Sequence, residues 1–227
     1  MNSHSLSEAL QDYLKEIYKL QQEHERATTS AIAEQLGVAP ASVTAMLKRL
    51  AALDLVEHEP YRGAVLTPTG MKIAIEVIRH HRLLEQYLAE TLGVGIDAVH
   101  AEADRLEHVL SEELEARIDA SLGYPTHDPH GDPIPDANLR LAPSELRELA
   151  SLEPGEEATI RRIPDESGLL RYLSDLRLMP GTRVKMFARA PFGGPLTIQI
   201  GRARHAISEE VALKIGVSAS GSMTSSE

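Results

Sequence analysis

Residues 28–70 read TTSAIAEQLGVAPASVTAMLKRLAALDLVEHEPYRGAVLTPTG, and the order of elements in this stretch decides the fold. A first helix is predicted over 29–36 and stops at Gly37, because glycine favours the left-handed conformation that follows a helix. A second helix is predicted over 40–53, with Pro40 in the first turn, where proline is best tolerated. Two helices joined by a short turn indicate a helix-turn-helix.

The residues on either side of this helix pair complete the motif. Strands over 55–59 and 64–66, separated by a turn over 60–63, predict a small β-hairpin. An amphipathic helix over 6–22 precedes the pair, with apolar residues at helical spacing. Helices followed by a hairpin are typical of a winged helix-turn-helix, in which one helix enters the major groove of DNA and the wing reaches a neighbouring phosphate.

The second helix of the pair has the side chains that a DNA-reading helix needs. Small and hydroxylated residues let the backbone approach the bases, whereas lysine and arginine meet phosphates. The residues expected to contact DNA are Thr29, Ala41, Ser42, Thr44, Lys48, Arg49 and, at the hairpin tip, Arg62. The alternative is a small helical bundle in which Lys48 and Arg49 form a solvated face.

Composition narrows the class of protein. The chain has 227 residues, 42% of them hydrophobic, a net charge of −11 and no cysteine. The absence of cysteine excludes disulfides and thiolate metal ligands. The negative charge argues against coating of nucleic acid by global attraction, but leaves sequence-specific binding open. The N-terminal residues lack the features of a signal peptide, and we expect a cytoplasmic protein without a membrane segment.

Histidines and carboxylates gather on two predicted helices, over 68–92 and 97–123. The candidate metal ligands are His81 and Glu85 on the first helix, and His100, Asp104, Glu107 and His108 on the second. Residues three and four apart share a helix face, so each set can reach one ion. Imidazole and carboxylate suit a hard or borderline divalent metal. Solvated surface pairs are one alternative, and a metal-dependent hydrolase is another, although the sequence has no HExxH motif.

The C-terminal part has a different pattern. A connector rich in proline and glycine over 124–135 and a short helix over 144–152 precede strands predicted over 157–163, 182–190 and 196–201, with a helix over 168–176. We therefore predict a mostly α protein with a small C-terminal β-barrel of SH3-like size. The expected domains are a winged helix over 1–72, a helical metal-binding and dimerisation domain over 73–140, a linker helix over 141–152, the SH3-like domain over 153–217 and a disordered tail over 218–227.

The chain resembles the diphtheria toxin repressor family, which includes iron-dependent and manganese-dependent transcriptional regulators. The resemblance rests on the order of these motifs: DYLKEIYKL at 12–20, SVTAMLKRL at 42–50, YRGAVLTPTG at 61–70, HHRLLEQYL at 80–88, VHAEADRLEHVLSEELEARID at 99–119, PHGDPIP at 129–135 and APFGGPL at 190–196. It implies a homodimeric repressor that binds palindromic operator DNA when a divalent metal is abundant.

The resemblance also implies two ligand sets. The regulatory site takes Asp12 from the first helix, together with Asp104, Glu107 and His108. The ancillary site takes His81, Glu85 and His100, completed from the C-terminal domain by Glu166, with Asp165 as a substitute. The dimer surface is expected to include Ile96, Val99 and Leu110.

Two departures from the family pattern bear on the metal. Iron-type members carry methionine and cysteine where Asp12 and Asp104 stand, and carboxylates shift the preference toward Mn²⁺, with Fe²⁺ as the alternative. Manganese-type members add a glutamate where this chain has Lys15, which argues against a two-metal cluster of that kind. Without metal, the carboxylates of Asp12, Asp104 and Glu107 are expected to repel one another and leave the first helix free to move.

Overall fold

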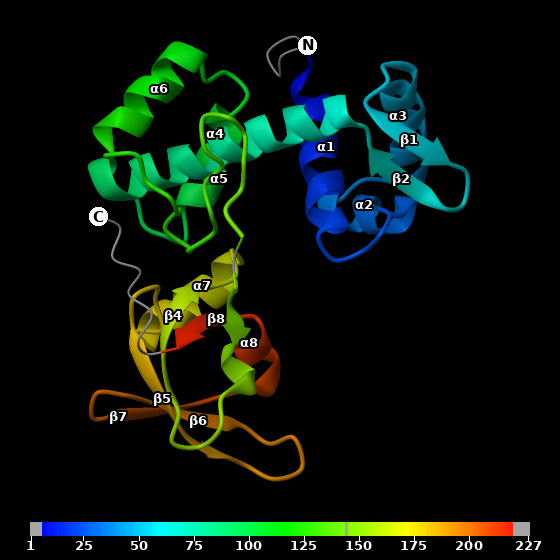
Figure 1. The fold of residues 1–227 in the computed structure, drawn as a ribbon. Coiled ribbons are helices and arrows are strands. Elements are labelled where there is room, and N and C mark those ends of the chain that lie inside the picture. Colours follow the sequence, from blue (N-terminus) through cyan, green and yellow to red (C-terminus); the bar gives the residue numbers. More distant parts are fainter. Residues whose placement is uncertain (1–5, 144, 220–227) are drawn as a thin grey trace. The chain divides into compact units, whose positions relative to one another are not determined.

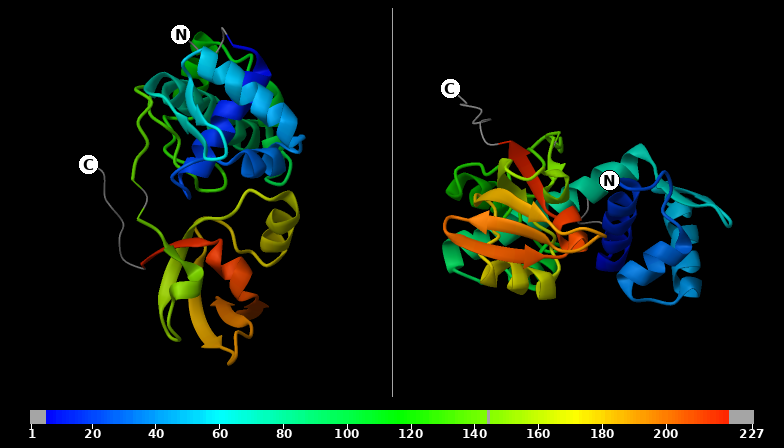
Figure 2. Two further views of the ribbon diagram at one scale, coloured as in Figure 1. Left: turned by 90° about the vertical axis from the view of Figure 1, so that its right-hand side faces the viewer. Right: turned by 90° about the horizontal axis from the view of Figure 1, so that it is seen from below.

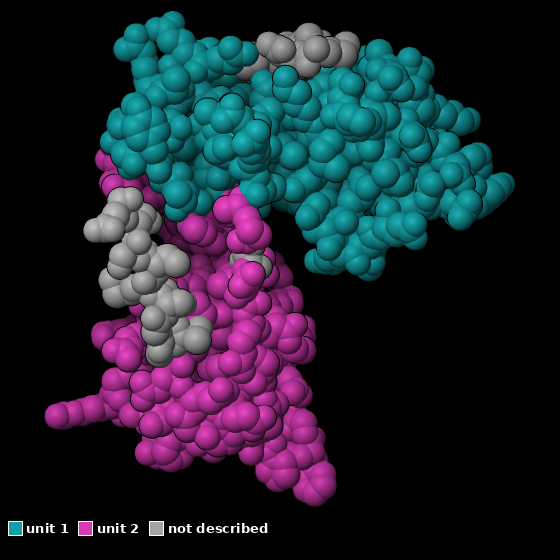
Figure 3. Space-filling model, in the orientation of Figure 1, with its two compact units in different colours: residues 1–84, 103–126, 134–141 teal, residues 85–102, 127–133, 142–227 magenta. Residues whose placement is uncertain are grey.

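The computed structural model describes residues 6–143 and 145–219, which fall into two compact units (Figures 1 and 3). As far as they are described, the first unit comprises residues 1–84, 103–126 and 134–141, and the second comprises residues 85–102, 127–133 and 142–227. Both units contain parts of the expected helical domain over 73–140, so the domain boundaries stay a prediction. Within the described residues, none of the helices is both long and apolar enough to pass through a bilayer.

The first unit begins with the predicted winged helix-turn-helix. Its elements are α1 (Glu8–Gln21), α2 (Thr29–Leu36), α3 (Pro40–Ala52), β1 (Val56–Glu59) and β2 (Gly63–Leu66). Thr28 caps α2 by accepting a hydrogen bond from the backbone N–H of Ala31 at 3.2 Å, and Gly37 ends it with a φ of 63°. The strands pair antiparallel, and Ala27 forms a further backbone bridge to Ala64. The sequence prediction of this motif is confirmed.

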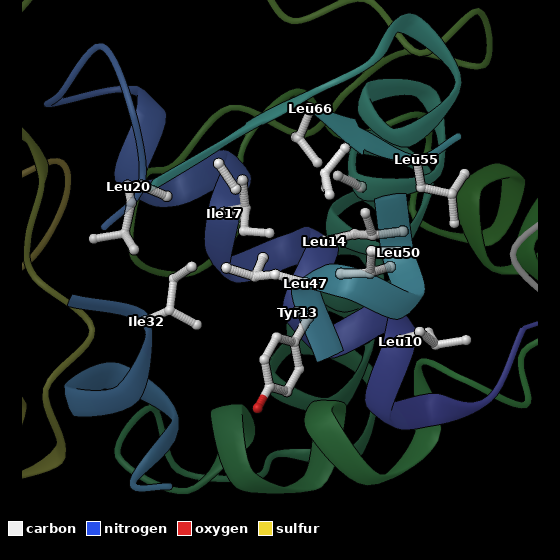
Figure 4. Close-up of a cluster of buried hydrophobic side chains, with 14 of the residues drawn as sticks. Leu10, Tyr13, Leu14, Ile17, Leu20, Ile32, Leu47, Leu50, Leu55 and Leu66 are labelled. Carbon is white, nitrogen blue, oxygen red and sulfur yellow. The ribbon is translucent and has the colours of Figure 1, made fainter. Parts of the chain in front are cut away.

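A single apolar cluster holds these elements together (Figure 4). Leu14 and Ile17 of α1 lie in it with Leu47 and Leu50 of α3 and with Leu55, which precedes the hairpin. All five are fully buried, and each contributes about 1.5–3 kcal/mol by leaving water. Because α3 packs on α1 through its apolar face, its opposite face is left exposed.

Three further helices follow, and they correct one prediction. They are α4 (Pro68–Leu92), α5 (Val99–Leu106) and α6 (Glu112–Ser121). The single helix expected over 97–123 is wrong, because Ser111 caps α6 by accepting a hydrogen bond from the backbone N–H of Leu114 at 3.3 Å. Glu107 and His108 therefore lie in the turn between two helices and not on a continuous helical face.

The second unit contains one antiparallel sheet, which Figure 2 shows from two sides. Its elements are β3 (Arg147–Glu148), a 3-10 turn (Leu149–Ser151), β4 (Glu157–Arg162), α7 (Ser167–Asp175), β5 (Arg183–Arg189), β6 (Leu196–Ile200), β7 (Ala203–Ile207), α8 (Glu209–Leu213) and β8 (Gly216–Ala219). The strand order is β3-β8-β4-β5-β6-β7. Since β3 and β7 form its two ends, the sheet is open, and the predicted closed barrel is wrong.

Two other predictions at the C-terminal end change. The helix expected over 144–152 is replaced, in its described part, by β3 and a 3-10 turn, because Leu149 and Leu152 turn into the core of the second unit and Arg147 pairs with β8. Residue 144 lies outside the described residues. Strand β8 continues to Ala219, two residues into the segment expected to be a disordered tail, and residues 220–227 lie outside the described part of the chain.

The close contact between the wing and the chain before α2 leaves no room for a side chain at Gly63. This residue has a φ of 93°, and a Cβ there would lie 2.4 Å from the carbonyl oxygen of Ala27. Gly63→Ala should lower the free energy of unfolding by about 2–4 kcal/mol, because the backbone of one strand must shift. Gly37→Ala is the matched control, with a φ of 63° and no atom within 4 Å, and should cost only about 1 kcal/mol. Urea unfolding followed by circular dichroism measures both variants, and equal losses would contradict the packing described.

Candidate metal centres and DNA-binding surface

Two overlapping groups of potential metal ligands lie in the first unit. One consists of Asp12, Glu107 and His108, and the other of His81, Asp104 and Glu107; within each group the ligand atoms lie within 4.8 Å of one another. The residues come from α1, from α4, from α5 and from the turn after α5. The structure thus brings together all four residues that the resemblance assigned to the regulatory site, and adds His81.

Glu107 is the residue that both groups share. It is 1% exposed, and its carboxylate is surrounded by nitrogen atoms. Nδ1 of His81 lies 2.5 Å from Oε2, and Nζ of Lys15 lies 2.6 Å from Oε1. Nε2 of His108 lies 3.5 Å from Oε1. A buried carboxylate requires such partners, because leaving it unpaired away from water costs several kcal/mol.

Lys15 connects α1 to one carboxylate on α5 and to another in the turn after α5. Its ammonium lies 2.9 Å from Oδ1 of Asp104 as well as 2.6 Å from Glu107, and the residue is buried. Burial works to lower the pKa of Lys15, but Glu107 and Asp104 outweigh it and raise the pKa above the ordinary value. Lys15 therefore offsets part of the repulsion expected between Asp12, Asp104 and Glu107, because its ammonium pairs with two of these three carboxylates.

His108 is oriented by a residue that the sequence analysis missed. Its Nδ1 lies 2.8 Å from Oε1 of Gln11, while its Nε2 lies 3.0 Å from Oδ1 of Asp12. The amide of Gln11 donates through Nε2 to the carbonyl of Leu6 at 3.3 Å, which turns its oxygen toward the ring. Nδ1 therefore donates to Gln11 and Nε2 faces Asp12. The hydrogen bond with Asp12 is the largest cause of the raised pKa of His108. Partial burial of the ring works to lower this pKa, and the negative charge of Glu107 works to raise it.

His80 contacts the turn that carries Glu107 and His108. Its Nδ1 lies 3.1 Å from the backbone oxygen of Glu107, and its Nε2 lies 3.0 Å from the carboxylate of Glu115 on α6. Glu115 is held in turn by Arg79, which also pairs with Asp119 at 2.6 Å. This network fixes the backbone from which Glu107 and His108 project.

A second group of potential ligands lies within the second unit. Glu85 of α4, His100 of α5 and Asp165, which follows β4, present ligand atoms within 4.8 Å of one another. Nδ1 of His100 lies 2.5 Å from Oδ2 of Asp165 and 3.2 Å from Oε1 of Glu85. His81 stands one helical turn before Glu85 on α4.

His130 also faces this group, although the sequence analysis treated its segment as a connector. Its Nε2 lies 3.5 Å from Oδ1 of Asp165 and 3.7 Å from Oε1 of Glu85, and neither ring nitrogen has a hydrogen-bond partner among the described residues. The backbone N–H of Ile163 donates to the carbonyl of His130 at 2.9 Å and holds the loop against β4. Burial works to lower the pKa of His130, but Glu85 and Asp165 raise it above the ordinary value. A buried imidazole without hydrogen bonds, aimed at two carboxylates, fits a metal ligand.

Glu166 lies outside the ligand groups of the described residues. Its carboxylate is exposed and pairs with Lys214 at 2.8 Å. Glu166 is extended, with a φ of −118° and a ψ of 111°, and the side chains of neighbouring extended residues point in opposite directions. Asp165, expected as the substitute, is the residue that the structure places there.

Most of the residues expected to contact DNA are exposed on the winged helix. Ala41, Ser42, Lys48 and Arg49 are exposed on α3, opposite its buried Val43 and Leu47, while Thr29 at the start of α2 and Thr44 are half-buried. Thr44 donates from its hydroxyl to the carbonyl of Pro40 at 3.0 Å. Arg62 at the wing pairs with Glu59 at 2.9 Å, and Glu59 also pairs with Arg26 at 2.7 Å.

Comparisons with known proteins cover the chain almost from end to end. Family profiles match residues 5–64 (iron dependent repressor, N-terminal DNA binding domain), 67–136 (iron dependent repressor, metal binding and dimerisation domain) and 147–219 (FeoA domain). The iron-dependent repressor IdeR of Mycobacterium leprae is 31% identical over 218 residues, which are 90% of this chain and 94% of the relative.

Two further matches are a transcriptional regulator and a solved structure described as manganese-dependent. The HTH-type transcriptional regulator MntR of Geobacillus kaustophilus is 39% identical over 116 residues, 51% of this chain and 82% of the relative. A solved structure described as a manganese-dependent transcriptional repressor complex with manganese superposes with a TM-score of 0.85 at 36% identity, covering 92% of this chain and 99% of that one.

The burial of Glu107 beside Lys15 has a consequence for stability. Lys15→Met keeps a long side chain but removes the ammonium, and should lower the free energy of unfolding of the metal-free chain by about 2–4 kcal/mol, because Glu107 stays buried with one cation fewer. Lys19→Met, at an exposed position of the same helix, should change it by less than about 0.5 kcal/mol. Urea unfolding in the presence of a chelator compares the two, and a Lys15→Met chain as stable as the control would contradict the role given to this ion pair.

Proposed function

The chain belongs to the diphtheria toxin repressor family of metal-dependent transcriptional repressors, and from that premise we propose that it represses genes of metal homeostasis when Mn²⁺ is abundant. Members of the family are DNA-binding regulators and not enzymes, so the hydrolase alternative is set aside. The observation that carries the proposal is the convergence of Asp12, Glu107 and His108 from α1 and from the turn after α5.

The donor chemistry supports manganese. Carboxylate oxygens and imidazole nitrogens form the first-unit groups, and the chain has no cysteine to offer a thiolate. Hard oxygen-rich sites suit Mn²⁺, whereas imidazole also suits Fe²⁺. Fe²⁺ is the second candidate, because the relative from Mycobacterium leprae is named an iron-dependent repressor. The alignment with this chain covers 94% of that relative.

The residues of the first unit explain how metal binding can reach the DNA-reading helix. Asp12 on α1, with Glu107 and His108 from the turn after α5, would hold a divalent cation, which would supply positive charge between them. Gln11 keeps Nε2 of His108 facing Asp12, and α1 in turn packs on α3 in a shared apolar cluster. A shift in the position of α1 therefore shifts α3, and metal favours DNA binding only to the extent that it binds one arrangement more tightly than the other.

We assign the DNA-binding surface to the exposed side of α3 and to the wing. Lys48 and Arg49 supply positive charge on α3 in a chain whose net charge is −11. At the wing, Glu59 holds the guanidinium groups of Arg26 and Arg62 near each other, which orders two cations for phosphate contacts. A homodimer would present two such surfaces to the two half-sites of a palindromic operator.

The dimer surface that we propose differs from the one expected from sequence. Val99 and Leu110 are buried, and Ile96 packs against the core of the second unit. In the first unit, Val109 is 68% exposed and Leu114 is 50% exposed. Both lie in the part that matches the metal binding and dimerisation profile, and we propose that a partner subunit covers them.

The metal response is tested by DNA binding with and without Mn²⁺. Duplexes selected from a random pool on the Mn²⁺-loaded chain should bind at least about tenfold more tightly with Mn²⁺ than with chelator, which corresponds to about 1.4 kcal/mol of coupling. Asp12→Ala should lose this response, whereas Glu8→Ala, at an exposed position one turn earlier on α1, should keep it. Fluorescence anisotropy measures both variants, with anaerobic Fe²⁺ as a parallel titration. A full response in Asp12→Ala would contradict the assignment.

Neighbouring residues after β4 provide a test of the second group. We propose that Asp165, with Glu85, His100 and His130, binds a second ion in the second unit, and that Glu166 takes no part. Asp165→Ala should weaken Mn²⁺ binding at this group by about 10–100-fold, as expected for loss of a ligand or of its support. Glu166→Ala removes the same charge from the next position and should leave binding unchanged. Equilibrium dialysis counts the ions, and equal effects of the two substitutions would refute the distinction.

A further inference from the structure

A lysine lies at the point where the two ligand groups of the first unit meet. We propose that the ammonium of Lys15 is a built-in cation of this centre and limits it to a single divalent ion. The inference rests on the proposed metal-binding function. It states that Lys15 determines how many ions the centre binds.

The first argument is the position of the ammonium. A divalent ion held by His81, Asp104 and Glu107 would need carboxylate oxygens that already face Lys15. Oδ1 of Asp104 lies 2.9 Å from Nζ and 3.3 Å from Nδ1 of His81, and Oε1 of Glu107 lies 2.6 Å from Nζ. An ion bound to these oxygens would stand next to the ammonium, where like charges repel strongly in a poorly solvated site.

The second argument is the balance of charge. The two groups contain three carboxylates, those of Asp12, Asp104 and Glu107, with a total charge of −3. Lys15 and one divalent ion together supply +3, whereas Lys15 and two divalent ions would supply +5. Buried ionic clusters are tolerated when their charges are compensated. The chain therefore completes a neutral centre with one ion.

The third argument is that the cation cannot leave. Lys15 follows Asp12 by three residues, which places both on one face of α1. The lysine stem is buried, and its ammonium contacts carboxylates of the α5 region. A tethered charge is present at every concentration of metal, so raising the Mn²⁺ concentration does not displace it in the way that one free ion displaces another.

The experiment counts Mn²⁺ ions in the full-length chain, with His100→Ala and Asp165→Ala introduced to silence the second unit. Equilibrium dialysis with atomic absorption gives the ions per chain, and electron paramagnetic resonance separates an isolated Mn²⁺ from a spin-coupled pair. The chain with Lys15 should bind one uncoupled ion. Lys15→Glu adds a ligand and reverses the charge, and should bind two coupled ions. Lys19→Glu makes the same charge change at an exposed position of α1 and should still bind one.

Lys15→Met provides a second measurement that does not depend on a new ligand. Removal of the ammonium without a replacement carboxylate should leave one ion, bound about tenfold more tightly, because a repelling charge is gone. Two coupled ions in the chain that retains Lys15, a single ion in folded Lys15→Glu, or unchanged affinity in Lys15→Met would each overturn the inference while leaving the metal-binding function in place. A chain that retains Lys15 and binds no Mn²⁺ in the first unit would overturn the proposed function itself.

Discussion

The burial of one carboxylate, that of Glu107, constrains the rest of the first unit. Desolvation of an unpaired charge costs several kcal/mol, a large part of the 5–15 kcal/mol that typically stabilises a folded domain. The chain can keep Glu107 inside only by bringing cations and polar hydrogens to it. Lys15 comes from α1 and His81 from α4, both within hydrogen-bonding distance of its oxygens. The need to pair the carboxylate of Glu107 therefore fixes where α1 and α4 meet the turn after α5.

That turn exists because of local sequence. Ser111 starts α6 as a cap, α5 ends at Leu106, and the residues between them leave the helical path. His80 then contacts the carbonyl of Glu107, which a continuous helix would have used in its own hydrogen-bond ladder. The break thus frees a backbone acceptor and points two side chains inward at once. A regulatory centre built on a turn can respond to a bound charge more readily than one on a rigid helix, because fewer backbone hydrogen bonds resist its movement.

Local signals in the sequence predicted the elements, while features that depend on tertiary contacts escaped it. Gly37 after α2 and Pro40 at the start of α3 indicated the helix-turn-helix, because signals for the start and end of a helix act within a few residues. Helical spacing also indicated His81 and Glu85 on α4 as candidate ligands, whereas Asp12 was implied only by the family resemblance. The open sheet was not, since closure depends on whether β3 and β7 pair. Neither the compensation of Asp104 by Lys15 nor the approach of His130 to Asp165 leaves a local signal, because each joins residues far apart in the chain.

The two candidate centres reach the same charge balance by different means. In the second unit, Glu85 and Asp165 carry a total charge of −2, and His100 and His130 can serve as neutral ligands, so one divalent ion completes a neutral set. In the first unit a third carboxylate is present, and Lys15 cancels it. The additional carboxylate and the lysine together tie α1 to the region beyond α5 even before metal is considered. A bound metal would then have less repulsion to overcome, because Lys15 already offsets one of the three negative charges.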